Sequence, residues 1–245
     1  MRRALIALAL PLPLLLGAGE PRRSGYDMMS PALQAMQRDD GSNPAMLWAE
    51  GGRALWQQWA CGKCHAPAAQ SMRGVAARYP AFDAALKKPI TLAQRIQQCR
   101  RLDHGAGLAP ESEDLLSISA WIALQSRGLP VAPPPDERLQ PFRERGQVLF
   151  ERRIGHLNLS CAQCHDQRAG AKLGGSTIPE AHPTGYPLYR LEWQGLGSLQ
   201  RRLRNCAAGV RAQPWDWNAE ELVDLELYLM QRAAGMPMDA PAVRP

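Results

Sequence analysis

Apolar side chains repeat every three or four positions in residues 111–124, as expected for one face of a helix: Leu115, Leu116, Ile118 and Ile122. Acidic residues in its first turn suit a helix N-terminus. Residues 46–59 predict an earlier helix, in which Gly51-Gly52 would allow two helices to cross closely. No run of alternating apolar and polar residues indicates a strand. The pattern therefore predicts an all-α protein.

The same pattern returns 107 residues later in the chain. Residues 92–99 align without a gap to residues 199–206, and each segment ends in a cysteine. The match continues through the next predicted helix, where it pairs Leu115 with Leu222 and Trp121 with Tyr228. A capping-box-like pair marks the start of that second helix: Asn218 and Glu221. We therefore predict two tandem domains related by internal duplication.

Turn residues and prolines give the expected domain boundaries. Before the repeat, residues 20–50 are polar and predicted to be irregular. The expected order is then a first domain at 51–128, a proline-rich linker at 129–137, a second domain at 138–235 and a C-terminal tail at 236–245.

Residues 1–19 have the pattern of a secretory signal peptide. A short basic region precedes an apolar stretch at residues 4–16, and small residues suitable for cleavage follow it. The stretch is shorter than the roughly 20 apolar residues that a membrane-spanning helix needs. We therefore expect an exported, periplasmic protein without a membrane span.

Two copies of the motif Cys-x-x-Cys-His indicate that each half of this helical repeat binds a cofactor. This spacing is the attachment signature of a c-type haem: two thiols form thioethers with the porphyrin, and the adjacent histidine ligates the iron. The sequence therefore predicts two tandem cytochrome c-like domains with two covalently bound haem c groups. The expected attachment residues are Cys61 and Cys64 for the first haem and Cys161 and Cys164 for the second, with His65 and His165 as iron ligands.

Two further cysteines, Cys99 and Cys206, occupy equivalent positions of the repeat. In an exported protein a disulfide between them is the ordinary interpretation. The alternative, favoured by the repeat, is that each ligates the haem iron of its own half. Other candidate ligands lie too close to a motif, fit a helix core or lack a counterpart in the other half: Met72, Met230, Met236, Met238, His104 and His182.

The charge of the chain is mildly basic. Its formal net charge of +6 falls to +4 once Arg2 and Arg3 leave with the signal peptide. This excess fits an acidic partner or a bound anion and does not call for nucleic acid. With three Phe and five Tyr the chain has few aromatic residues for a core, and two haems would supply much of the missing interior.

The chain resembles the SoxA family, the di-haem cytochrome subunits of the SoxAX complex of sulfur oxidation. The resemblance covers nearly the whole mature chain, including residues 24–44 and the second haem region at 157–166. Its most specific mark is Arg201-Arg202-Leu203-Arg204-Asn205-Cys206, where an arginine precedes the trailing cysteine by four residues.

The resemblance implies an L-cysteine S-thiosulfotransferase. Such an enzyme joins thiosulfate to a cysteine of the SoxYZ carrier protein while two electrons leave through haem, and its partner is a small SoxX cytochrome. Cys206 is implied as the active-site cysteine, which carries a persulfide and ligates the second haem iron, and Arg202 as the residue that binds thiosulfate. Cys99 would ligate the first haem iron.

The residues agree with these roles. In a helix, Arg202 lies one turn before Cys206, and its planar guanidinium suits a sulfonate. Arg95 mirrors Arg202 in the first half, but glutamines replace the neighbouring arginines there. We therefore expect the second haem to be the reactive one and the first to serve electron transfer or structure.

Two other functions stay open. A plain electron-transfer di-haem cytochrome c would not need the arginines around Cys206. A di-haem thiosulfate dehydrogenase, which forms tetrathionate, would be expected to pair a cysteine ligand with a methionine-ligated second haem. A di-haem peroxidase fits less well, because no open, histidine-rich site is evident.

Overall fold

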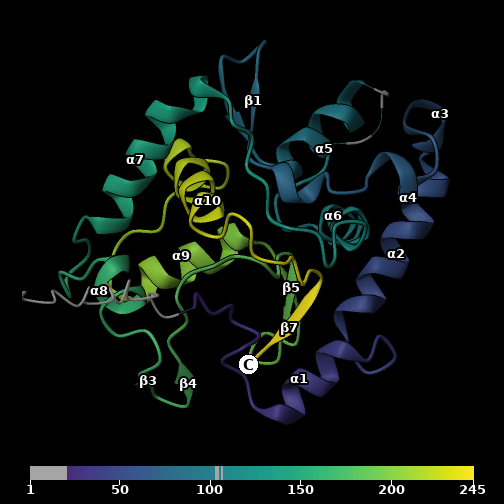
Figure 1. Ribbon diagram of the computed structural model, residues 1–245. Helices are drawn as coiled ribbons and strands as arrows, with labels where there is room; N and C mark the ends of the chain where they lie inside the picture. The colour runs from purple at the N-terminus through teal and green to yellow at the C-terminus, as the bar shows by residue number, and fades with distance from the viewer. Residues whose placement is uncertain (1–20, 103–104, 106) are drawn as a thin grey trace, which may run out of the picture.

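The computed structural model describes residues 21–102, 105 and 107–245, and its two halves are built mainly of helices (Figure 1). The helices of the first half are α1 (Pro31–Arg38), α2 (Ala45–Gln58), α3 (Gly62–His65), α4 (Ala68–Ser71), η1 (Ala76–Arg78), α5 (Leu92–Leu102) and α6 (Glu113–Leu124). Those of the second half are η2 (Glu137–Leu139), α7 (Gln140–Glu151), α8 (Cys161–His165), α9 (Leu199–Gly209) and α10 (Glu220–Arg232). The predicted signal peptide and His104 lie outside the described residues. Within the described part, no helix is both long and apolar enough to cross a membrane.

One close helix crossing lies in the core of each half. A Cβ added to Gly52 of α2 would lie 2.0 Å from the carbonyl oxygen of Ser117 on α6. A Cβ added to Gly146 of α7 would lie 2.1 Å from the carbonyl oxygen of Asp224 on α10. Only glycine allows the backbones to approach this closely. The close crossing predicted at Gly51-Gly52 is thus confirmed for Gly52.

The described residues also form short strands: β1 (Ala81–Asp83), β2 (Lys88–Ile90), β3 (Lys172–Leu173), β4 (Ser176–Thr177), β5 (Leu188–Arg190), β6 (Gly195–Gly197) and β7 (Ala242–Arg244). β1 pairs with β2 and β3 with β4, both antiparallel, while β5 lies between antiparallel β6 and parallel β7. The prediction of a protein without strands is therefore wrong, although helices dominate. Strands of two or three residues are too short to show an alternating pattern.

The elements that follow each haem motif recur at an offset of 107 residues. Helices α5 and α9 begin and end 107 residues apart. Strands β5 and β6 repeat the register of β1 and β2, since Ala81 pairs with Ile90 and Leu188 pairs with Gly197. His65 and His165 differ by only 100 residues, so the second half is seven residues longer after its motif. The β3–β4 hairpin lies in this longer segment.

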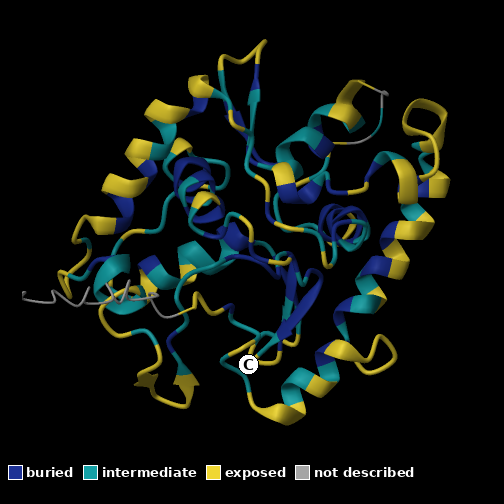
Figure 2. Cartoon of the chain, viewed as in Figure 1, coloured by how far each residue is buried: buried dark blue, intermediate teal, exposed yellow. Residues whose placement is uncertain are grey.

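Both ends of the described chain are tied into the fold. The prediction that residues 20–50 are irregular is wrong for α1 and for the start of α2. The tail at 236–245 ends in β7, whose Val243 N–H donates to Gln37 Oε1 of α1 at 3.2 Å. Figure 2 shows β5 and β7 as a buried centre beside the first helices. Pairing with β5 explains the order of this tail, which no local sequence pattern indicates.

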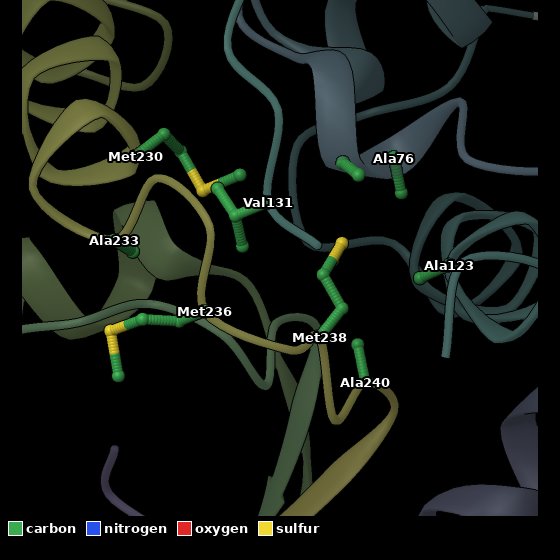
Figure 3. Close-up of a cluster of buried hydrophobic side chains, with 9 residues drawn as sticks. Ala76, Ala123, Val131, Met230, Ala233, Met236, Met238 and Ala240 are labelled. Carbon is green, nitrogen blue, oxygen red and sulfur yellow. The ribbon is translucent and has the colours of Figure 1, made fainter. Parts of the chain in front are cut away.

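A cluster of methionine and alanine side chains packs the linker and the tail against both halves (Figure 3). Val131 of the proposed linker is buried in this cluster, and its N–H donates to the carbonyl oxygen of Met236 at 2.8 Å. Met230 and Met238 are buried in the same cluster. The methionines after α10 therefore stabilise the contact between the two halves.

Candidate active site

The second haem motif lies on α8, whose first residues are fixed by a capping box. Ser160 Oγ accepts the N–H of Gln163 at 3.2 Å, and Gln163 Oε1 accepts the N–H of Ser160 at 2.9 Å. Positions separated by three and four residues share one helix face. Cys161, Cys164 and His165 therefore project together from a single fixed turn.

One hydrogen bond orients the ring of His165. Its Nδ1–H donates to the carbonyl oxygen of Pro179 at 2.7 Å, which leaves Nε2 as the nitrogen with a lone pair. Burial lowers the pKa of His165, and the positive charge of Arg202 adds to this effect. A neutral imidazole with a fixed tautomer is the form that ligates a metal.

A cavity of about 380 Å³ connects His165 with the helix that carries the trailing cysteine. Arg202 and Cys206 both line this cavity and lie one turn apart on α9. The predicted helical spacing of these two residues is therefore confirmed. The rest of the wall comes from the N-terminal segment, the β3–β4 hairpin, β5 and α10, including Met28, Ser176, Tyr186, Leu188, Arg190 and Leu229.

One thiol of the motif, that of Cys161, interacts electrostatically with Cys206. Burial, together with a negative charge on Cys206, raises the pKa of Cys161 to about 11. His165 and Cys206 thus line one cavity, and the two attachment cysteines lie on the same helix as His165. This set of donors fits a haem c attached through Cys161 and Cys164.

The arginines around Cys206 differ in what they contact. Arg201 stacks over Trp193 at 4.4 Å, and Arg204 stacks over Trp217 at 4.4 Å. Within the described residues, the side chain of Arg202 forms no hydrogen bond or ion pair. Of these three, Arg202 alone lines the cavity with Cys206. Its donors are therefore available to an anion.

The first haem motif has a more open setting. Cys64, His65 and Cys99 are exposed, whereas Cys61 packs against the core cluster of the first half. The ring of His65 lies 6.0 Å from that of Trp56. Arg95, the counterpart of Arg202, is ion-paired with Asp83 at 2.9 Å. The first half thus has the same arrangement of haem motif, helix and trailing cysteine as the second, but the charge of its helix arginine is neutralised.

The structure bears on the alternatives for the trailing cysteines. Cys99 and Cys206 are both free thiols, so the disulfide is not formed. Met236 and Met238 are buried in the cluster between the halves, and Met72 is buried in the first-half core. His182 lines the Cys206 cavity, where its Nδ1–H donates to the carbonyl oxygen of Arg23 at 2.9 Å.

Tyr186 and Arg190 also line this cavity, and the sequence alone assigned no role to either. Burial raises the pKa of Tyr186 to about 12, so its hydroxyl stays protonated at neutral pH. Arg190 is 8% exposed and shares the cavity with Cys206. Neither belongs to a motif, but continuing the 107-residue alignment would have paired Arg190 with Asp83.

Comparison with known proteins shows which proteins this chain is similar to. The family model described as SoxA/TsdA, cytochrome c domain, matches residues 48–131 and 145–238. The chain is 33% identical over 229 residues to the L-cysteine S-thiosulfotransferase subunit SoxA of Pseudaminobacter salicylatoxidans, which covers 90% of this chain and 80% of the relative. It is also 33% identical over 232 residues to the SoxA subunit of Rhodovulum sulfidophilum, covering 91% and 80% respectively. The crystal structure of SoxXA from P. pantotrophus matches with a TM-score of 0.85 and 27% identity, over 91% of this chain and 87% of that chain.

Proposed function

The chain belongs to the SoxA/TsdA cytochrome c domain family, and we propose how its residues divide the work of that family's SoxA branch. The protein is an L-cysteine S-thiosulfotransferase subunit with a haem c, active in thiosulfate oxidation. Its substrate, its number of haems, the ligands of the haem iron and its partners belong to the proposal.

The proposed reaction joins two sulfur atoms. The sulfane sulfur of thiosulfate bonds to the cysteine sulfur of a SoxYZ carrier protein, giving a cysteine S-thiosulfonate. Thiosulfate carries two negative charges and the carrier thiolate one, while the product carries one, so two electrons leave. Bound haem c would supply a one-electron acceptor, so the two electrons would leave one at a time to oxidised cytochrome.

Cys206 is the residue proposed to handle sulfur. It lies in the same cavity as His165, and these two residues would hold the iron of a haem attached through Cys161 and Cys164. As a persulfide, Cys206 would hold sulfur beside the electron acceptor. The guanidinium groups of Arg190 and Arg202 line the same cavity as Cys206.

Arg202 is proposed to bind the sulfonate group of thiosulfate. Its planar donors match paired oxygens, and its side chain has no partner among the described residues. The i,i+4 spacing holds this guanidinium one helical turn from Cys206. Thiosulfate bound there would place its sulfane sulfur toward the cysteine.

The first half is proposed to carry a second haem c on Cys61 and Cys64, with His65 and Cys99 as its ligands. Its helix arginine is already neutralised by Asp83, so it lacks a free anion-binding group at that position. We therefore assign this haem to electron transfer or structure. We also infer that the two halves arose by internal duplication, supported by the recurrence of α5–α6 as α9–α10.

The partners and compartment follow from the same family. A relative's crystal structure contains SoxXA, so a SoxX-like small cytochrome c is the proposed partner in a heterodimer. The proposed location is the periplasm, supported by the sequence pattern of residues 1–19 and by covalent haem attachment. No nucleic acid is expected as a partner.

A single observation carries this proposal: Arg202, Cys206 and His165 line one cavity. The test supplies haem-loaded protein with thiosulfate, oxidised cytochrome and a carrier ending in cysteine. We expect reduction of the cytochrome and a thiosulfonate adduct on the carrier, detected by mass spectrometry. Tetrathionate formed equally well without carrier would instead indicate a thiosulfate dehydrogenase, and no reaction in either case would indicate a plain electron carrier.

A further inference from the structure

Equivalent strands of the two halves carry opposite charges at one position. β1 ends at Asp83 and β5 ends at Arg190, and these residues differ by 107 positions. The pairing register is the same in both, because Asp83 lies opposite Lys88 and Arg190 lies opposite Gly195. The two side chains therefore occupy corresponding places beside helices α5 and α9.

In the first half, this position neutralises an arginine. Asp83 Oδ2 lies 2.9 Å from a guanidinium nitrogen of Arg95, the counterpart of Arg202. The other oxygen of Asp83 accepts the N–H groups of Ala85 and Leu86 at 3.0 and 2.9 Å. A carboxylate held in this way leaves Arg95 with its charge compensated.

In the second half, the same position adds a positive charge. Strand alternation turns Leu188 and Arg190 toward the Cys206 cavity, while Tyr189 packs against Trp48 on the other side. Burial and the nearby charge of Arg202 lower the pKa of Arg190. Two guanidinium groups thus face one cavity where the first half has an ion pair.

Arg190 is buried but only partly satisfied. Its Nη2 donates to Glu192 Oε2 at 2.8 Å, at a carboxylate that is 64% exposed. Its Nε is buried and has no acceptor among the described residues. Buried donors of this kind are costly unless a partner is present. Arg244, a partly buried arginine that also lines the cavity, already donates to Asp239 at 2.6 Å.

We propose that Arg190 is a second anion-binding residue of the Cys206 cavity, and that it binds the sulfonate group of thiosulfate together with Arg202. This inference rests on the proposed function, since it names the group that completes the thiosulfate site. A sulfonate has three oxygens and can accept hydrogen bonds from two guanidinium groups at once. Its negative charge would also offset the repulsion between Arg190 and Arg202.

The shared chemistry is recognition of an oxyanion, which has two sources in this cavity: thiosulfate and a haem propionate. The experiment measures thiosulfate binding to oxidised, haem-loaded protein by calorimetry without carrier or acceptor, alongside haem content. Arg190→Gln should retain both haems and weaken thiosulfate binding roughly tenfold to a hundredfold, the effect of one charge-assisted hydrogen bond. Arg201→Gln is the matched control, since Arg201 stacks on Trp193 and does not line the cavity; it should change affinity less than twofold.

A second variant places at position 190 the residue type that the first half has at the equivalent position, Asp83. Arg190→Asp should pair with Arg202 as Asp83 pairs with Arg95, and should abolish measurable thiosulfate binding. Unchanged affinity in Arg190→Gln with full haem content would overturn the proposal. Loss of haem from both Arg190→Gln and Arg190→Lys would also overturn it, since it would assign Arg190 to a propionate.

Failure of this inference is distinguishable from failure of the proposed function. If wild-type protein binds thiosulfate in an Arg190-dependent way but transfers nothing to a carrier, the function is wrong and the anion site stands. If wild-type protein forms the carrier adduct and Arg190→Gln binds thiosulfate normally, only the role of Arg190 is wrong.

Discussion

Arg202 and Arg204 lie two positions apart on α9, yet their surroundings give them different chemistry. Arg204 lies over the ring of Trp217 at 4.4 Å, where stacking holds its guanidinium. Arg202 lines the cavity of Cys206, and its donors have no partner in the described part of the chain. Residue type alone therefore does not assign function here; the direction of each side chain from the helix does.

The first prediction separates these two arginines. Arg202→Lys keeps the charge but loses the planar fork, so turnover with thiosulfate, carrier and oxidised cytochrome should fall roughly tenfold or more. Arg204→Gln should cost little, because Arg204 stacks on Trp217 and does not line the cavity of Cys206. Both variants should retain haem. Equal, salt-dependent losses in the two variants would mean that the arginines act only as a general positive field.

Glu226 gives a second prediction at this scale. It lines a smaller cavity of about 100 Å³ between the halves, and burial raises its pKa to about 8. In the unfolded chain the group titrates near 4.5, so between these values the folded state binds one more proton. The free energy of unfolding should therefore fall by about 1.4 kcal/mol per pH unit as pH rises through this window.

Removing this carboxylate should remove that slope. Glu226→Gln should raise the free energy of unfolding at pH 8 relative to wild type and flatten its decline above pH 5, as measured by denaturant titration at several pH values. Glu113→Gln, which alters an exposed side chain of α6, is the control and should leave the slope unchanged. An identical slope in Glu226→Gln and wild type would contradict a neutral, buried Glu226.

Local pattern reveals some residues of the site and conceals others. Cys206 and Arg202 were found because their helix repeats that of Cys99 and Arg95, and because the motif resembles a known family. Arg190 was missed, because a strand of three residues carries no periodic signal. Its burial depends on the pairing of β5 with β6 and β7, which is set by contacts distant in the sequence.

Among the elements, helices were predicted more reliably than the segments that start or join them. The helix expected at 111–124 is present as α6, with Ser112 as its N-cap. The capping role predicted for Asn218 is wrong, since Asn218 has a φ of 63° and α10 begins at Glu220 after Ala219. The N–H of Asn218 instead donates to Gln200 Oε1 at 3.0 Å, a tertiary contact that overrides the local signal.

The helix crossings provide a third prediction. Gly52→Ala would place a methyl group 2.0 Å from the carbonyl oxygen of Ser117, so α2 and α6 must separate. We expect a loss of about 1–3 kcal/mol in the free energy of unfolding, as for other overpacked cores. Gly51→Ala is the matched control on the same helix, because its Cβ would meet Ser117 Oγ at an ordinary 3.5 Å.

The control has the opposite expected sign. Alanine is a better helix former than glycine by about 1 kcal/mol, so Gly51→Ala should be neutral or slightly stabilising. Denaturant unfolding of both variants with haem attached measures the difference. Equal effects of the two substitutions would show that the crossing of α2 and α6 does not depend on the missing Cβ of Gly52.

At the scale of the whole molecule, two halves with similar secondary structure differ in their chemistry. Each half has a haem motif, a short antiparallel strand pair, and a helix with an arginine four residues before a cysteine. The second half adds the β3–β4 hairpin, whose residues help to enclose the Cys206 cavity, and replaces Asp83 by Arg190. The first half keeps an ion pair and an exposed cysteine. Function therefore follows from differences between the halves, which the shared pattern by itself does not contain.

The last prediction tests this asymmetry through the two trailing cysteines. If the halves divide the work as proposed, Cys99→Ala should alter the absorption spectrum of one haem and leave thiosulfate transfer to the carrier within about twofold of wild type. Cys206→Ala should alter the spectrum of the other haem and abolish transfer, because it would remove both the proposed iron ligand and the proposed sulfur-carrying group. Each variant is the other's control, since both remove one thiol from equivalent helices, α5 and α9.

Potentiometry extends the same test. A thiolate ligand stabilises ferric iron, whereas a methionine ligand raises the reduction potential. Loss of the thiolate should therefore raise the potential of one haem in each variant and leave the other haem unchanged. Abolished transfer in Cys99→Ala with the second haem intact would mean that both halves take part in sulfur chemistry, and the charge difference between Asp83 and Arg190 would then need another explanation.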